Sequence, residues 1–132
     1  NFMVRFAKAA ENGFKGVEIL FPYGHPVDEL QAALKEYSLE QVLLNSPPGN
    51  MEQGERGRAA VPGKEEAFWE DIQEAIEYSR VLNCHQIHVM AGILSSPDDW
   101  KNVRSTFVDN LKRAAPLAAP SLFMKRGLQK SN

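Results

Sequence analysis

Three short apolar runs alternate with four amphipathic segments along this chain, and the alternation constrains the fold more than any other feature. The apolar runs, rich in strand-forming residues, occupy positions 15–21, 40–45 and 86–90. Apolar residues recur at helical spacing over 3–12, 26–37 and 64–82, and in a last helical segment that begins at Ser95. Strands that alternate with helices indicate parallel βαβ units joined by right-handed crossovers. We therefore predict an α/β fold in which three parallel strands alternate with helices.

The two later helices carry the clearest inward-facing stripes. At the end of the last helix, Pro116 and Pro120 are expected to stop it or kink it, because proline lacks the donor that a helix interior needs. The expected stripes are Phe68, Ile72, Ala75, Ile76, Ser79 and Leu82 in the first of these helices, and Val103, Phe107, Leu111, Ala114 and Ala115 in the second.

The strands read as nearly continuous apolar runs, which is typical of strands buried on both faces. Three strands are few for such a sheet. The pattern fits either a doubly wound sheet or part of a (β/α)8 barrel. A complete barrel needs about 250 residues, so this chain of 132 residues would form only about half of one.

Composition excludes several classes of function. Hydrophobic residues make up 43% of the chain and the net charge is −2, so nothing in the bulk composition favours nucleic acid or an anionic membrane surface. No apolar run approaches the length of about 20 residues that crosses a bilayer. The lone Cys84 excludes an intrachain disulfide and fits a reducing compartment, so we expect a cytoplasmic protein.

The segment between the second strand and the 64–82 helix is unusually long. Strand-to-helix connections in α/β units run about 2–6 residues, whereas this one extends over 45–63 and contains four glycines and three prolines. It also carries Asn45, Glu55 and Arg56, which can hold a small anion or hydroxyl groups. Long loops of this kind often carry binding residues.

Four linked motifs carry a family resemblance. They are the run 13–23, the run 42–49 (Val-Leu-Leu-Asn-Ser-Pro-Pro-Gly), the Gly-Glu-Arg-Gly of 54–57 followed by Pro-Gly at 62–63, and the His-Val-Met-Ala-Gly of 88–92. Together they resemble the hydroxypyruvate isomerase family and the closely similar 2-oxo-tetronate isomerases. Both groups are xylose isomerase-like TIM barrels, whose wider kin include sugar-phosphate epimerases and an endonuclease branch.

The resemblance implies a single-domain (β/α)8 barrel that interconverts hydroxypyruvate and tartronate semialdehyde through an enediol. Such a reaction needs a carboxylate that moves a proton and a group that stabilises the developing oxyanion. The family also implies a divalent cation that polarises the substrate carbonyl. A small keto or hydroxy acid is accordingly the expected ligand.

The chain departs from the family pattern at both ends. The family's first strand would precede residue 1, and its fifth strand, with a glutamate, would follow Pro120. Instead, residues 121–132 diverge and no carboxylate occurs after Asp109. We therefore assign residues 1–120 to the N-terminal half of a barrel and expect 121–132 to be a disordered tail. The family's catalytic glutamates and metal ligands cannot be carried over, so no catalytic or metal-binding residue is assigned and the chain is expected to be inactive alone.

The active sites of such barrels lie at the carboxyl ends of the strands. That rule selects Glu18, Asn45 and His88 as substrate-binding candidates, and the fork of Arg56 suits a substrate carboxylate. Each has a simpler interpretation as well. Glu18 would be costly inside an apolar strand unless it were functional or paired, Asn45 can open a turn, Arg56 can be a solvated charge, and His88 can be a core histidine.

Other residues are interpreted structurally. His85 and His88 mimic a metal-binding pair, but residues i and i+3 of a strand point to opposite faces, so joint chelation is not expected. Cys84 is expected to pack in the interior. The large aromatic side chains of the later helices are expected in the core or at its rim: Phe68, Trp69, Trp100 and Phe107.

Two rival functions stay open. One is a non-catalytic chain that binds a carboxylate or self-associates, because an incomplete barrel leaves strand edges and apolar helix faces uncovered. The other is a divergent endonuclease-like barrel, which the absence of a basic surface and of a His/Asp/Glu metal constellation disfavours.

Overall fold

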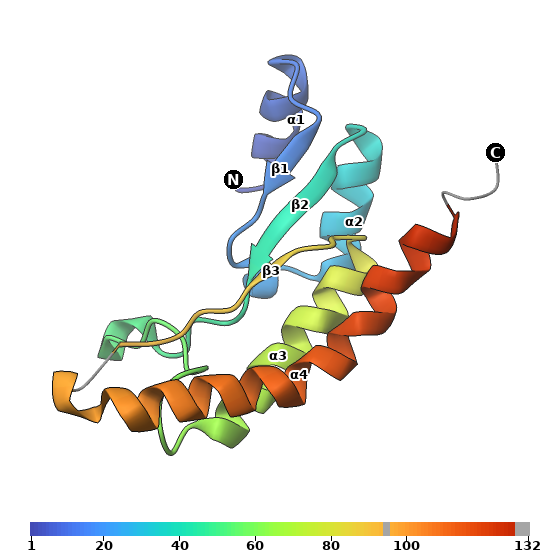
Figure 1. Cartoon of the computed structure of the whole chain (residues 1–132). Coiled ribbons are helices and arrows are strands. Elements are labelled where there is room, and N and C mark those ends of the chain that lie inside the picture. The colour runs from blue at the N-terminus through green and yellow to red at the C-terminus, as the bar shows by residue number, and fades with distance from the viewer. Residues whose placement is uncertain (94–95, 129–132) are drawn as a thin grey trace.

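The computed structural model describes residues 1–93 and 96–128, which form one parallel sheet with helices packed against it (Figure 1). The first helix precedes the first strand, and helices and strands then alternate as the sequence predicts. The elements are α1 (Val4–Glu11), β1 (Gly16–Glu18), α2 (Val27–Glu36), β2 (Glu40–Asn45), α3 (Glu65–Val81), β3 (Ile87–His88) and α4 (Trp100–Leu128), with short 3-10 turns at Pro22–Gly24, Met51–Gln53 and Pro97–Asp99.

The sheet has the order β1-β2-β3, and both pairings are parallel. Val17 pairs with Gln41 and Glu18 with Leu43, so β2 carries one extra residue at this point. On the other side of β2, Asn45 pairs with His88. All three strands therefore run in the same direction, and their carboxyl ends meet at one edge, which confirms the predicted α/β class with three parallel strands.

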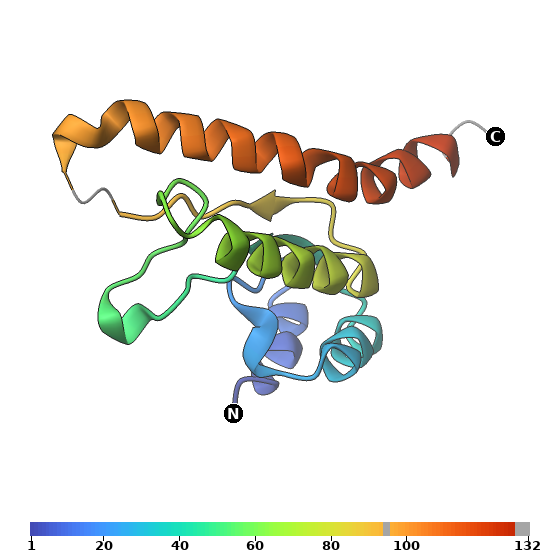
Figure 2. The ribbon, with the colours of Figure 1, turned by 90° about the horizontal axis from the view of Figure 1, so that it is seen from below.

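Two apolar clusters form the core, and each joins helices to the strands they flank. The first lies between α3, α4 and β2, with Phe68 (2% exposed), Ile76 and Leu44 at its centre. The second joins α1, β1 and α2 around Phe6 and Leu30. Figure 2 shows the helices arranged in chain order along the sheet, with α3 directly beneath α4. This serial arrangement is that of an open segment of a β/α barrel.

The predicted stripe of α3 is confirmed, because all six of its expected inward residues are buried. Packing along this face supplies the energy that holds the helix, since helix propensity alone is small. Two expectations for α4 are wrong: Ala115 is exposed, and Trp100 is 61% exposed where we expected core or rim.

The structure differs from the sequence predictions mainly at the ends of elements. β1 and β3 are shorter than the predicted runs 15–21 and 86–90, because beyond the paired residues the chain leaves the ladder. Helix α4 continues through Pro116 and Pro120 to Leu128 instead of ending there. Its axis changes direction along its second half (Figure 1), as a proline in a helix interior promotes. The expected disorder of 121–132 stays a prediction, and residues 129–132 lie outside those described.

None of the helices in the described part of the chain is long and apolar enough to span a membrane. Cys84 is buried at 2% exposure, as expected, and its thiol donates to the carbonyl oxygen of Gln86 at 3.3 Å.

Candidate functional site at the carboxyl ends of the strands

Asn45 and His88 form the centre of the candidate site. They are the last residues of β2 and β3, they are paired in the ladder, and the Nδ1 atom of His88 lies 3.2 Å from the Oδ1 atom of Asn45. Asn45 is buried, whereas His88 is exposed. Because the amide oxygen can only accept, Nδ1 of His88 carries the proton in this bond, and a neutral ring then presents Nε2 as an acceptor.

Main-chain contacts hold this pair in place. The main-chain N–H of Asn45 donates to the carbonyl oxygen of Leu20 at 2.9 Å, and the hydroxyl of Tyr23 donates to the main-chain carbonyl of Asn45. Tyr23 packs edge-on against Tyr78, and burial raises the pKa of its hydroxyl, so Tyr23 acts as a donor throughout the physiological range. The amide of Asn45 is therefore aimed by contacts from the segment after β1 as well as by its own strand.

The next residue, Ser46, ties β2 to the segment that follows β3. Its main-chain N–H donates to the carbonyl oxygen of His88 at 2.9 Å, and its hydroxyl accepts from the N–H of Met90 at 3.0 Å. Ser46 is 1% exposed. The ladder thus continues through a side chain beyond the last strand residue, which keeps the two strand ends together under the site.

The long loop folds back onto the end of β3 at a close main-chain crossing. Gly57 bridges Ala91 in antiparallel fashion, and the N–H groups of Ala59 and Ala60 donate to the carbonyls of Met90 and Ala91 at 3.3 and 2.7 Å. A Cβ atom on Gly57 would lie 2.2 Å from the carbonyl oxygen of Met90. The second glycine of the Gly-Glu-Arg-Gly motif is therefore required by contact with the segment after β3.

Inside the loop, Arg58 joins two carboxylates. Its Nη2 atom lies 2.9 Å from Oε2 of Glu55, and its Nη1 atom lies 3.2 Å from Oδ1 of Asp71 in α3. The Arg58 hydrogen bond and the N–H of Asn50 lower the pKa of Glu55 to about 2. Burial raises the pKa of Asp71, and Arg58 offsets that effect only in part. This network fastens the loop to the helix that follows it.

The described contacts of Arg56 are with the main chain of its own loop. It is exposed, and its Nη1 atom donates to the carbonyl oxygens of Glu55 and Met51 at 2.7 and 3.1 Å. These bonds brace the turn at Met51–Gln53. The described contacts do not join Arg56 to the pair of Asn45 and His88, so its role as a substrate ligand stays a prediction.

Glu18 ends β1, at the same edge of the sheet as the other candidates. It is exposed, so the expectation that it lies buried in an apolar strand is wrong. Among the described residues β1 is an edge strand of the sheet, and Glu18 is its last residue. A role for Glu18 in binding likewise stays a prediction.

Sequence reasoning missed the residues that orient the site. Tyr23, Ser46, Arg58 and Asp71 act through contacts between distant segments. A sequence signal existed for Arg58, which belongs to the same glycine-bounded loop as Arg56. The burial of Asp71 on α3 had no such signal, because it depends on where the loop lies.

The pair of Asn45 and His88 brings an amide and an imidazole together, and both are groups that form hydrogen bonds with oxygen atoms. A divalent cation does not fit these residues, because within 1–93 and 96–128 no group of three His, Cys, Asp or Glu side chains is placed to hold one. We therefore derive no step through a metal.

Parallel strands alternate with helices in chain order, and polar side chains lie at the carboxyl ends of the strands. This arrangement is that of part of a β/α barrel. The family model described as "Xylose isomerase-like TIM barrel" matches residues 6–123. The chain belongs to this family.

Two relatives within this family are isomerases. A 2-oxo-tetronate isomerase of Cupriavidus necator is 47% identical over 118 residues, covering 89% of this chain and 45% of its own length. A hydroxypyruvate isomerase of Escherichia coli is 40% identical over 115 residues, covering 87% and 45%. This chain thus spans less than half the length of these relatives.

Among solved structures, an AP endonuclease, family 2, from Brucella melitensis matches with a TM-score of 0.89 and 43% identity, over 92% of this chain and 47% of that one. The agreement extends across nearly all of the chain, which supports the partial-barrel description.

Proposed function

We propose that this chain forms the N-terminal part of an isomerase barrel that acts on a small hydroxylated 2-keto acid. The observation that carries the proposal is the hydrogen-bonded pair of Asn45 and His88 at the carboxyl ends of β2 and β3. Relatives named for hydroxypyruvate and 2-oxo-tetronate isomerisation match the same stretch. The proposed reaction is the interconversion of hydroxypyruvate and tartronate semialdehyde, or its 2-oxo-tetronate counterpart, by proton transfer through an enediol.

In this proposal the pair positions substrate. With its Nδ1 proton donated to Asn45, His88 offers Nε2 to a substrate hydroxyl. The remaining amide N–H groups of Asn45 donate to a carbonyl or hydroxyl oxygen. Arg56, braced through Nη1, offers its other N–H groups to the substrate carboxylate. Glu18, at the carboxyl end of the neighbouring strand β1, contributes a carboxylate to the proposed substrate site.

We further propose that the chain alone does not catalyse the reaction. Proton transfer between adjacent carbons needs a carboxylate base and acid held at the substrate. The sequence has no carboxylate after Asp109, and Glu18 is solvent-exposed on an open edge. Binding without turnover is therefore the activity assigned to this chain, in a cytoplasmic setting that its lone cysteine favours.

Hydroxypyruvate titrated into the purified chain tests this function. We expect the imidazole signals of His88 to shift in NMR spectra, and binding to weaken at least tenfold in His88→Ala and in Arg56→Met. A matched control, Arg104→Met, replaces an exposed arginine of α4, a helix that carries none of the four candidate residues, and should bind as the parent does. Equal losses in variant and control, or turnover by the chain alone, would refute the proposal.

The name of the Brucella structure raises a nuclease as the second candidate. The net charge of −2 argues against a DNA-binding surface, because backbone affinity comes from clustered Lys and Arg. We propose that the chain does not bind DNA. Retention of a fluorescent duplex at low salt, lost on adding salt, would overturn this.

A further inference from the structure

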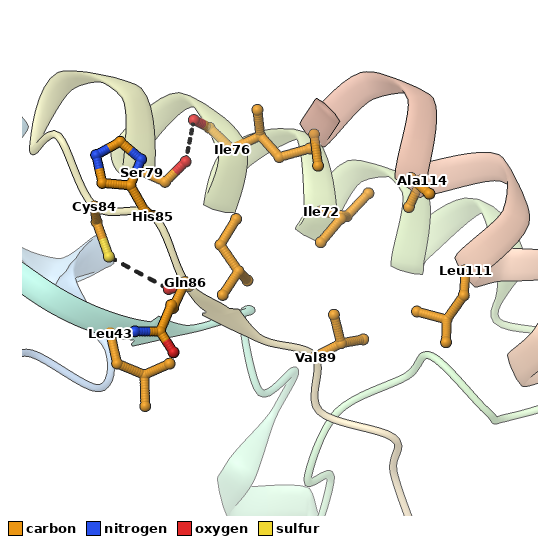
Figure 3. Close-up of a pocket in the computed structure, with 13 residues that line it drawn as sticks. Leu43, Ile72, Ile76, Ser79, Cys84, His85, Gln86, Val89, Leu111 and Ala114 are labelled. Atoms are coloured by element: carbon orange, nitrogen blue, oxygen red, sulfur yellow. Dashed lines mark hydrogen bonds between the residues drawn. The ribbon is translucent and has the colours of Figure 1, made fainter. Parts of the chain in front are cut away.

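A carboxylate interrupts the apolar face of α3, outside the hydrogen-bonded pair at the strand ends. Asp71 is 8% exposed, and Phe68 and Ala75, one turn before and after it, belong to the core cluster of this helix. Figure 3 shows the neighbouring Ile72 and Ile76 facing the pocket between α3, α4 and β3. Burial raises the pKa of Asp71, because an ionised carboxylate loses hydration there. The carboxylate therefore carries a cost that packing alone does not explain.

Asp71 is ion-paired with Arg58 of the long loop. Both of its oxygens accept from Nη1 of Arg58, at 3.2 and 3.3 Å. A buried ion pair is weak evidence for stability, since well-packed apolar residues in its place are often as stable or more stable. Its best supported role is to fix one arrangement of the segments that it joins. The pair of Asp71 and Arg58 is therefore explained by what it holds in place, which is the loop before α3.

The other edge of the Arg58 guanidinium holds Glu55. The Nε and Nη2 atoms of Arg58 lie 3.3 and 2.9 Å from Oε2 of Glu55. The same oxygen accepts from the main-chain N–H of Asn50 at 2.6 Å, and the N–H of Glu55 donates to the carbonyl oxygen of Asn50 at 2.9 Å. The planar fork of arginine suits this bridging because its N–H groups keep fixed directions. The carboxylate of Glu55 thus closes the turn that begins at Asn50.

Arg56 is held by the same turn. Its Nη1 atom donates to the carbonyl oxygens of Met51 and Glu55. Gly57, the next residue, bridges Ala91 in the segment after β3, so Arg56 lies beside the crossing at the carboxyl end of that strand. A continuous set of contacts therefore joins α3 to Arg56.

We propose that Asp71 is a positioning residue for Arg56 and thereby for the substrate carboxylate. Through Arg58 and Glu55 it orders the turn on which Arg56 lies. A side chain that is ordered before the ligand arrives loses less conformational entropy on binding. The inference rests on the proposed function, in which Arg56 is the carboxylate ligand. Loss of Asp71 should accordingly weaken the binding of a carboxylate and leave the pair at the strand ends intact.

The first test measures the order of the Arg56 side chain without any ligand, by the {1H}–15N NOE of its Nε–H group. Asp71→Ala removes both acceptor oxygens, and Glu70→Ala is the matched control at an exposed position of α3. We expect the NOE to fall in Asp71→Ala, to be partly restored in Asp71→Asn, and to keep the parent value in Glu70→Ala. An unchanged NOE in Asp71→Ala, or an equal fall in the control, would overturn the proposal.

Two ligands then separate the carboxylate contact from the rest of the site. Hydroxypyruvate has a carboxylate where dihydroxyacetone has a neutral hydroxymethyl group, and NMR titration of the His88 imidazole signals follows both. We expect Asp71→Ala to weaken hydroxypyruvate binding about fivefold, a size typical of residues that act through others, and to change dihydroxyacetone binding little. Equal losses for the two ligands would indicate general disruption of the site and contradict a positioning role.

A double variant keeps the test decisive if Asp71→Ala does not fold. Asp71→Leu combined with Arg58→Met replaces the ion pair by apolar side chains, so we expect the urea midpoint to stay or rise while hydroxypyruvate binding weakens about fivefold. Undiminished binding in the double variant would refute the proposal. If the parent does not bind hydroxypyruvate, or Arg56→Met binds it equally well, the proposed function fails instead, and the NOE of Arg56 still decides whether Asp71 positions that side chain.

Discussion

The crossing of the long loop over the end of β3 leads to our most specific prediction, which concerns Gly57→Ala. Gly57 has φ of +100°, and an added Cβ would lie 2.2 Å from the Met90 carbonyl oxygen, which is main chain and cannot rotate away. The loop must therefore separate from the segment after β3. Separation breaks the bonds from Ala59 and Ala60, each contributing about 0.5–1.5 kcal/mol.

Gly54→Ala provides a matched control in the same loop. Gly54 also has a positive φ, of +88°, but a Cβ there meets no atom within 4 Å. Both substitutions carry the left-handed backbone cost of about 1–2 kcal/mol, and both gain similarly from a less flexible unfolded chain. The difference between them therefore isolates the crossing, and we expect Gly57→Ala to be less stable than Gly54→Ala by about 1–3 kcal/mol, the sum for two hydrogen bonds.

Urea unfolding followed by the fluorescence of the half-buried Trp69 measures both free energies. Hydrogen exchange at the Ala60 amide, which donates to the Ala91 carbonyl at 2.7 Å, reports on the crossing itself. We expect faster exchange there in Gly57→Ala alone. Equal free energies for the two variants, with Ala60 still protected in both, would refute the inference that this glycine is required by close contact.

Three further predictions concern the loop and the core. The pKa of Glu55 is lowered to about 2 in the folded chain, from an ordinary value of 4.5, so its contribution to stability is complete above about pH 4.5 and disappears as the pH falls toward 2. Glu55→Gln should therefore flatten the pH dependence of the unfolding free energy in that window, and an unchanged pH profile would contradict the assignment. The side chain of Asn110, which is 4% exposed, donates to the main-chain carbonyl of Ala59 in the long loop at 2.8 Å. Asn110→Ala should therefore lower the free energy of unfolding by about 1–3 kcal/mol, whereas Asn102→Ala, at an exposed position, should change it little. Similar urea midpoints for the two variants would argue against a stabilising role for the hydrogen bond between Asn110 and the loop. Phe68 is 2% exposed at the centre of the core, so Phe68→Ala should lower the free energy of unfolding by about 3–5 kcal/mol. Phe14 is 61% exposed, so Phe14→Ala should have little effect on thermal unfolding. Comparable losses in the two variants would contradict the placement of Phe68 in the core.

The order and type of the elements follow from local sequence. Periodicity in 64–82 selects a helix because one face must be apolar, and the structure buries all of that face. Short apolar runs bounded by Gly and Pro select strands, and alternation makes them parallel. Three of the four candidate residues, Glu18, Asn45 and His88, were found by a topological rule: parallel strands place their carboxyl ends at one edge, whatever the side chains are.

Local sequence is thus sufficient to predict the class of fold and the strand ends that carry polar groups. Which of those groups meet depends on how the strands and the long loop pack. Asn45 bonds His88 because their strands are neighbours in exact register, while Arg56 turns to its own loop and Glu18 lies exposed on an edge strand. The buried Asp71 and the glycine crossing depend likewise on segments far apart in the chain. Such contacts depend on long-range packing, which local propensity and periodicity do not encode.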